Sequence, residues 1–401
     1  MDDIKILIVE DEEDQLELYE DAITEFNDES TKFTLVPKIA KTKENAEAIL
    51  ETDFFDAAFI DLNLTAATVG EETAEGNDLV DLIMQDMRYP IFVVTGKANG
   101  HITELAEKNT FIKLHIKDEE ELSNNLLKEV EKIYSTGITK VLGARGSLND
   151  YLDKIFWNHL SLTMPHWLSI ECDNCKIEKT ISRYTLTHLY EYMEETEGTE
   201  KILYDSSEMY IFPRIKTTIR PGDIVTNGEL KYLVLTPACT IAKKCEQFQL
   251  IKIVLLADNK DIVKSKENIE KAKTNIIQHK KKKDSLGVDI YEDRLKKLVE
   301  VREKKINNLK GLIGNYISNT KGEGYHFLPK FLQFEESLVD FQDIITVSKD
   351  NINKYSGIAT ISIHFFKDIQ ARFSAFYARQ GSPDFDNKKL SQGIMEKILE
   401  S

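Results

Sequence analysis

Three carboxylates, one hydroxyl and one amine each follow a short apolar run in the first third of the sequence. Carboxylates held close together repel one another, and a hard divalent cation such as Mg²⁺ relieves that repulsion. An aspartate in such a group can attack phosphorus, while a nearby amine and hydroxyl bind the phosphoryl oxygens. The five residues are Glu10, Asp11, Asp61, Thr95 and Lys117. They predict a Mg²⁺-dependent phosphoryl-transfer site in which Asp61 is the acceptor.

Apolar runs of strand length alternate with amphipathic helical segments in this part of the chain. Buried runs of this kind, separated by helices, are typical of a parallel sheet covered on both faces. The predicted strands are residues 4–9, 34–36, 57–60, 91–94 and 111–116. The pattern predicts an α/β fold with a doubly wound, five-stranded parallel sheet, whose sites form outside the carboxyl ends of the strands.

The acidic block after the first strand has a second interpretation. Acids at a strand-to-helix junction often cap the helix and interact favourably with its dipole. We expect Glu13 and Asp14 to act only in this way. Glu10, Asp11 and Asp61 together favour a cation site instead.

The whole arrangement resembles the receiver domain of bacterial response regulators over about residues 3–130. The resemblance implies phosphorylation by a sensor histidine kinase, with Mg²⁺ bound at the site. It assigns the acidic pair to Glu10 and Asp11, the phosphoacceptor to Asp61, the switch hydroxyl to Thr95, the conserved lysine to Lys117 and a main-chain metal ligand to Asn63. Phosphorylation chemistry is therefore expected.

The sequence departs from the receiver pattern in the part that transmits the signal. The loop after Asp61 is several residues longer than in the family, and Leu114 stands where a Tyr or Phe is usual. Asp118 replaces the usual proline after Lys117. These differences predict weaker coupling to the output face, or coupling through residues 64–76.

Composition places the protein in a general class. A chain of 401 residues is expected to form two or three domains. It lacks an apolar run of about 18 residues and an N-terminal secretory signal, so no membrane association is expected. Four cysteines do not make a disulfide scaffold, and a reducing cytoplasm is the expected location.

Charge is distributed unevenly along the chain. The net charge is −17, which argues against nonspecific nucleic-acid binding by the chain as a whole. Residues 1–130 hold 32 acids and 11 bases, a net charge of −21, whereas residues 258–310 hold 10 acids and 16 bases, a net charge of +6. Charge arguments must therefore be made for each domain separately.

The rest of the chain follows a different pattern. We expect residues 1–130 to be a receiver domain, 131–200 a helical spacer or dimerisation segment, and 201–401 a β-rich α+β output module. The turn signals "RPGD" and "NGE" between strand-like runs predict a small antiparallel sheet or barrel.

A helical hairpin is predicted within this module, over about residues 262–318. Leu295, Val299, Ile306, Leu309 and Ile313 recur at steps typical of a coiled coil, around a turn near "DSLGVD". The basic run Lys280–Lys283 near its tip is interpreted as solvated surface, with a nucleic-acid or acidic-protein contact as the alternative.

The cysteines allow a metal hypothesis. Cys172 and Cys175 have a zinc-knuckle spacing, and Cys239 with Cys245 could complete four thiolates. The second pair is spaced too widely for a typical site. Small buried or half-exposed residues are the preferred interpretation.

No output motif is found after residue 130, so three functions compete. The first is a regulator that signals through protein contacts with a second copy, a second regulator or an effector. The second is a phosphate sink that competes with another regulator for a shared kinase, for example in phage defence. The third is an effector enzyme or nucleic-acid binder with a site around Cys239, His326 and the basic arm. The strings "LVLTPAC" and "YHFLP" resemble a bacterial domain without an assigned activity, and imply none.

Overall fold

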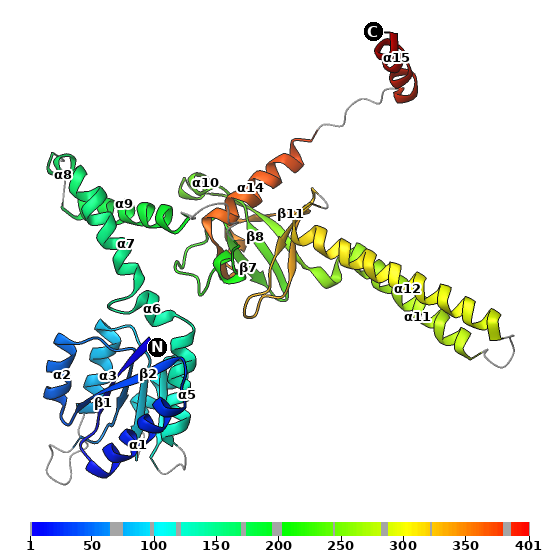
Figure 1. The fold of residues 1–401 in the computed structure, drawn as a ribbon. Coiled ribbons are helices and arrows are strands. Elements are labelled where there is room, and N and C mark those ends of the chain that lie inside the picture. The colour runs from blue at the N-terminus through cyan, green and yellow to red at the C-terminus, as the bar shows by residue number, and fades with distance from the viewer. Residues whose placement is uncertain are drawn as a thin grey trace. The chain divides into compact units, whose positions relative to one another are not determined.

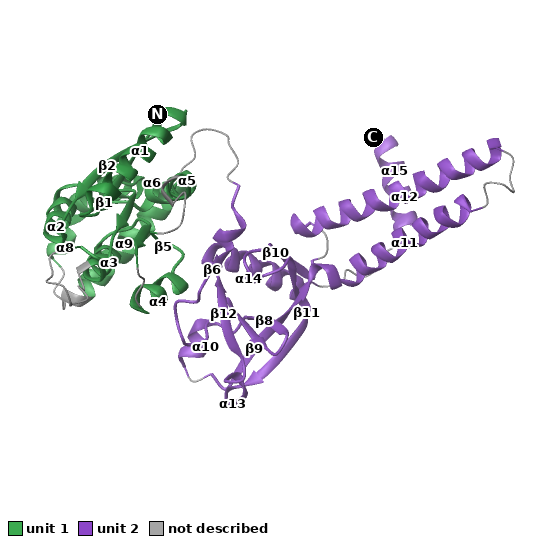
Figure 2. Ribbon diagram, turned by 90° about the horizontal axis from the view of Figure 1, so that it is seen from below, with its two compact units in different colours: residues 1–200 green, residues 201–401 purple. Residues whose placement is uncertain are grey.

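The protein is described by a computed structural model, which divides the chain into two compact units, residues 1–200 and 201–401 (Figures 1 and 2). Each unit has its own sheet and hydrophobic core. In the described part of the chain, no helix is both long and apolar enough to cross a membrane. The described residues are 2–64, 75–96, 100–117, 122–169, 174–194, 203–243, 245–281, 288–320, 323–379 and 386–400.

The first unit contains the predicted parallel sheet. Its strand order is β2-β1-β3-β4-β5, and all neighbouring strands are parallel. This is the order of flavodoxin-like folds, in which the strand order reverses beside β1 and β3. The strands are β1 (Asp2–Val9), β2 (Phe33–Ala40), β3 (Ala57–Ile60), β4 (Ile91–Thr95) and β5 (Ile112–Ile116). The α/β fold predicted from the apolar periodicity is confirmed.

Helices cover both faces of this sheet. On one face α1 (Glu13–Glu29) and α5 (Leu122–Ser135) bury Leu16, Tyr19 and Leu126 against the strands. The other face is covered by α2 (Lys43–Thr52), α3 (Glu75–Asp86) and α4 (Gly100–Lys108). The sheet is therefore closed to solvent on its faces, and polar side chains collect at its ends.

Helices continue after the receiver-like sheet. They are α6 (Ile138–Leu142), α7 (Ser147–Ile155), the π-helical turn η1 (Phe156–Leu160), α8 (Ser161–Leu168) and α9 (Asn174–Glu194). Among the described residues of 147–194, Ile155 alone is buried. This helical segment therefore has almost no core of its own.

The second unit is built on a seven-stranded antiparallel sheet in the order β10-β11-β9-β8-β7-β12-β6. The sequence predicted either an antiparallel sheet or a small barrel. The structure contains the open sheet, with β10 and β6 at its two edges. Its strands are β6 (Tyr210–Ile211), β7 (Asp223–Asn227), β8 (Leu230–Val234), β9 (Gln247–Leu255), β10 (Tyr325–Leu328), β11 (Ser337–Ser348) and β12 (Ser356–Ile361). The sequence did not predict β12, and the sheet is larger than expected.

Apolar side chains pack on both faces of this sheet. Helix α14 (Ile363–Tyr377) covers one face with Phe366 and Ile369, and α13 (Lys349–Ile352) contributes Ile352 to the other. Of two short elements, α10 (Ala238–Ala242) connects β8 to β9, and η2 (Ser206–Met209) leads into β6. The chain ends in α15 (Asn387–Glu400).

The predicted helical hairpin leaves the sheet between β9 and β10 (Figure 1). It consists of α11 (Lys260–Lys280) and α12 (Val288–Ile317), which pack along each other. Ile262, Leu312 and Tyr316 fix its base to Leu338 of the sheet. The predicted turn near "DSLGVD" lies largely outside the described residues.

Candidate functional site

The backbone places three of the predicted site residues directly after their strands, and a fourth, Thr95, at the end of β4. The amide of Glu10 donates to Ala40 O at 3.0 Å, and the amide of Asp61 donates to Val9 O at 2.9 Å. The amide of Lys117 donates to Thr95 O at 3.1 Å. These bonds extend the parallel ladder by one residue, so the side chains emerge together at the carboxyl edge of the sheet.

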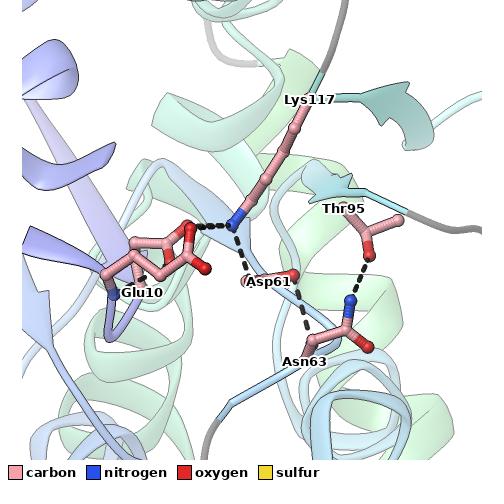
Figure 3. Close-up of polar contacts among 6 residues, drawn as sticks. Glu10, Asp61, Asn63, Thr95 and Lys117 are labelled. Atoms are coloured by element: carbon pink, nitrogen blue, oxygen red, sulfur yellow. Dashed lines mark hydrogen bonds and ion pairs between the residues drawn. The ribbon is translucent and has the colours of Figure 1, made fainter. Parts of the chain in front are cut away.

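Lys117 lies at the centre of the site (Figure 3). Its Nζ is 2.8 Å from Asp61 Oδ2 and 2.9 Å from Glu10 Oε2, with Glu12 Oε2 at 3.5 Å. The Glu10 and Asp61 side chains are buried, whereas Glu12 is exposed. One ammonium therefore pairs with two buried carboxylates and offsets part of the cost of desolvating them.

The electrostatics of this cluster depend on burial and on its charged neighbours. Burial raises the pKa of Glu10, and the Asp61 charge adds to that effect against the opposing hydrogen bond from Lys117. Burial alone would lower the pKa of Lys117, but its bonds to Asp61 and Glu10 raise it. The lysine is held in its charged form, and the buried glutamate resists ionisation.

The donor set fits a hard cation. Glu10, Asp11 and Asp61 each offer an oxygen, and these atoms lie within 4.8 Å of one another. Oxygen ligands at such spacing suit Mg²⁺ or another divalent cation. The raised pKa of Glu10 shows that the present charges do not fully offset the cost of burying the carboxylates. The geometry is therefore compatible with a metal held by the three acids.

Asn63 connects the acceptor to the switch hydroxyl. Its backbone amide donates to Asp61 Oδ1 at 3.1 Å, and its side-chain Nδ2 donates to Thr95 Oγ1 at 3.2 Å (Figure 3). The receiver resemblance assigned only its main-chain carbonyl, as a metal ligand, and that role stays a prediction. The side-chain bond was not predicted, since nothing in the spacing of Asn63 and Thr95 indicates it.

Two other contributors were missed. Tyr19 is buried beside the site and stacks on Phe59 with ring centroids 5.6 Å apart. Burial raises the pKa of its hydroxyl, and Glu10 and Asp61 raise it further. Gly76, at the start of α3, touches the backbone of Asp61. The inward position of Tyr19 on α1 was a usable signal, whereas the approach of Gly76 was not visible in the sequence.

Other predicted features lie apart from this cluster. Glu13 and Asp14 occupy the first turn of α1, as expected, but the capping residue is Glu12, whose side chain makes no capping bond. Leu114 is half-buried and packs against the core of the sheet. Most of the 64–76 loop, and Asp118, lie outside the described residues.

The zinc hypothesis stays a prediction. Cys172 and the side chain of Cys175 lie outside the described residues. Cys239 is an exposed thiol in α10, whereas Cys245 is buried and its Sγ donates to Gln247 O at 2.9 Å. Among the described side chains, one group could hold a metal ion, and it is formed by the three acids Glu10, Asp11 and Asp61.

Strand order and side-chain placement together decide the fold of this unit. The N-terminal third of the chain has the receiver-domain fold of response regulators. The receiver domain is an α/β unit with acids at β1 and β3, threonine at β4 and lysine at β5, all at one sheet edge.

Solved structures of response regulators are among those to which this chain is similar. The N-terminal domain of a response regulator from Carboxydothermus hydrogenoformans is 20% identical, with a TM-score of 0.26, and the match covers 33% of this chain and 98% of that one. The BeF3-activated receiver domain of RstA from Klebsiella pneumoniae is 18% identical, with a TM-score of 0.24, over 32% and 96%. The Mn(2+)-bound response regulator Rcp1 is 22% identical, with a TM-score of 0.23, over 34% and 94%.

These matches concern the receiver unit alone. No family model matches the chain. No curated protein matches it either.

Proposed function

We propose that the protein is a response regulator that accepts a phosphoryl group on Asp61 from a sensor histidine kinase. The observation that carries this proposal is the position of the Lys117 ammonium, 2.8 Å from Asp61 and 2.9 Å from Glu10. A buried aspartate beside a fixed cation and a hydroxyl is suited to a reaction that brings negative charge to the aspartate. The location proposed for this activity is the cytoplasm.

The chain's own residues account for most of the chemistry. An Asp61 carboxylate oxygen attacks phosphorus, an O–P bond forms, and the bond from phosphorus to the kinase histidine nitrogen breaks. Lys117 Nζ then pairs with the new phosphoryl charge, and the Thr95 hydroxyl turns from Asn63 to donate to a phosphoryl oxygen. Burial of Asp61 limits access of competing water.

The cofactor proposed for this site is Mg²⁺. Glu10, Asp11, Asp61 and the main-chain carbonyl of Asn63 would hold it. When bound, the ion neutralises the carboxylates and the transferring phosphoryl oxygens. Removal of Asp11 should weaken metal binding before it affects folding, because an acid beside two others contributes repulsion when no cation is bound.

Covalent labelling tests the acceptor. Acetyl phosphate with Mg²⁺ should add one phosphoryl group to the protein, and Asp61→Asn should abolish the mass shift. Asp53→Asn is the matched control, since Asp53 is a half-exposed aspartate of the same unit paired with Lys38. Labelling that persists in Asp61→Asn would show that another residue is the acceptor.

The proposed output is protein contact through the helical arm, α11 and α12. The sequence around it carries a net charge of +6, against −21 in the receiver. Tyr316 Oη donates to Asn259 Oδ1 at 3.1 Å and to Asp261 Oδ2 at 3.3 Å, which ties the two helices together at the base. A long basic hairpin anchored at one end is suited to contact an acidic protein surface.

Excision tests the arm. Replacing residues 266–309 by a short Gly-Ser bridge keeps Ile262, Leu312 and Tyr316, which form the base. Receiver phosphorylation should be unchanged, while assembly with an acidic partner should be lost at low salt. Unchanged assembly at both low and high salt would remove the arm from the output. Phosphotransfer with no effect on any assembly would favour the phosphate-sink alternative.

A further inference from the structure

The helix that follows the receiver carries a row of apolar residues at four-residue intervals. Helices α7, η1 and α8 run without interruption from Ser147 to Leu168. Residues four apart lie on one ridge of a helix. The row, called here the outer row, consists of Leu148, Leu152, Phe156, Leu160, Met164 and Leu168. Leu148 and Leu160 are half-buried, and the other four are exposed, reaching 79% at Leu168.

A neighbouring row on the same helix already has a partner in α9. His159 Nε2 is 2.8 Å from Tyr192 Oη. Trp167 packs on Tyr184, with ring centroids 5.5 Å apart, and Tyr151 packs on Tyr192 at 6.0 Å. Helix α9 thus covers one side of the helix and leaves the outer row open.

The stretch around the outer row has an unusual charge pattern. Charged residues make up 30% of the chain, yet residues 155–170 contain no Asp, Glu, Lys or Arg. The receiver, with a net charge of −21 over residues 1–130, repels the receiver of a second copy. Two copies can meet at this stretch without opposing like charges. Interface centres are typically poor in charge and rich in aromatic residues and Met.

We infer that the outer row is the interface of a homodimer, independent of phosphorylation at Asp61. A two-fold dimer requires one self-complementary patch, and a four-residue ridge packs against a copy of itself. With α9 from each copy, the pair of chains would form a four-helix arrangement.

The area of the patch suits this occupant. Together with Trp157, whose ring packs edge-on against Phe156, the row presents roughly 700 Å² of residue surface, near the roughly 800 Å² that each partner buries in a standard interface. A membrane surface fits less well, because helices that lie on lipid carry basic residues beside the apolar face. The charge-free stretch has none.

The mass of the full-length protein in solution tests the inference. We expect a dimer by sedimentation at micromolar concentration. Phe156→Glu should raise the dissociation constant at least about 100-fold, because it places a charge at the centre of the interface. The matched control is Leu18→Glu on α1, since Leu18 is 55% exposed and Phe156 is 54% exposed. This control should remain dimeric.

Folding and alternative partners need separate measurements. Acetyl-phosphate labelling and circular dichroism should match the wild type in Phe156→Glu, and Leu168→Glu provides a second variant if they do not. A photo-crosslinking residue at position 156 should give a covalent dimer. A monomeric wild type would overturn the inference. If that monomer also floats with phosphatidylcholine vesicles, the outer row binds a membrane instead of a second copy. A Phe156→Glu protein that dimerises as tightly as the wild type would also overturn it.

Discussion

Gly76 should be essential to the geometry of the acceptor site. It lies in the first turn of α3, and a Cβ added there would be 2.6 Å from Leu62 Cα and 2.8 Å from Asp61 O. Carbon atoms in contact prefer separations of about 3.5 to 4.0 Å. Since both neighbours are backbone atoms, neither can rotate away. Gly76→Ala must therefore shift the start of α3 or the Asp61 backbone by about 1 Å.

The expected effects follow from that displacement. Overpacking of this kind costs about 1 to 3 kcal/mol, so the free energy of unfolding should fall by that amount. A misplacement of about 1 Å at a reacting group costs on the order of 100-fold in rate. Phosphorylation of Gly76→Ala by acetyl phosphate and Mg²⁺ should therefore be about 100-fold slower than that of the wild type.

Gly100 supplies the matched control. It begins α4 at the same edge of the sheet, and a Cβ there would meet no atom within 4 Å. Gly100→Ala should leave the labelling rate unchanged and stabilise the unit by up to about 1 kcal/mol. Labelling time courses and urea unfolding measure both effects. A Gly76→Ala protein that is destabilised and yet phosphorylated at the wild-type rate would mean that only α3 moves. That result would refute the claim that Gly76 positions Asp61.

Three further variants test the site and the second unit. Burial raises the pKa of Glu10, so ionisation of this carboxyl destabilises the fold as the pH rises above 4.5, the ordinary pKa of a glutamate. Glu10→Gln should therefore be more stable than the wild type at neutral pH without metal. With saturating Mg²⁺ it should be less stable than the wild type, because it lacks a metal ligand. Asn63→Ala removes the bond from Nδ2 that holds Thr95 Oγ1 in place, worth about 1 kcal/mol, so beryllium fluoride that draws Thr95 toward Asp61 should bind up to about fivefold more tightly. The hydrogen bond from His326 lowers the pKa of Asp368 from its ordinary value of 3.8 to about 2. The ionised Asp368 therefore contributes its full stabilisation above pH 3.8, and this stabilisation is lost as the pH falls through about 2. Asp368→Asn should therefore flatten the acid limb of stability in that window, measured by urea unfolding against pH.

Controls make these three predictions specific. Glu12→Gln removes an exposed acid near Lys117 and should leave metal-free stability unchanged. Equal metal-free stability of Glu10→Gln and the wild type would contradict the stated cost of burying Glu10. Unchanged beryllium fluoride affinity in Asn63→Ala would show that the bond to Thr95 does not compete with the phosphoryl group. If Asp368→Asn loses stability at low pH as the wild type does, the acid dependence of the free energy of unfolding arises from other carboxylates.

The sheet of the receiver could be predicted because its strands are buried on both faces. Such strands are uninterrupted apolar runs, and the run 57–60 coincides with β3. The second strand was predicted too short, at 34–36, because Pro37 and Lys38 follow. Strand β2 lies at the edge of the sheet, and no strand pairs with its outer side. A proline is tolerated there, because the N–H that it lacks would have no ladder partner on that side.

Contacts set by loop geometry could not be predicted in this way. The bond from Asn63 to Thr95 and the approach of Gly76 to Asp61 depend on how chain segments return to the sheet. In the second unit, β12 pairs with β7, although the arm and four strands separate them in sequence. Sequence periodicity specifies which face of a strand is buried, but not its neighbour.

The Asn63–Thr95 bond also bears on how a signal leaves the site. Leu114 replaces the aromatic residue expected to follow the threonine, and it is packed against the core. If the threonine's release from Asn63 is the main difference between states, the coupling is worth about 1 kcal/mol, and the population shifts about fivefold. A switch from 1:99 to 99:1 requires about 5.5 kcal/mol. A regulator with this site must therefore gain the remainder from contacts outside it, such as the 64–76 loop, whereas a phosphate sink needs no more than the site itself supplies.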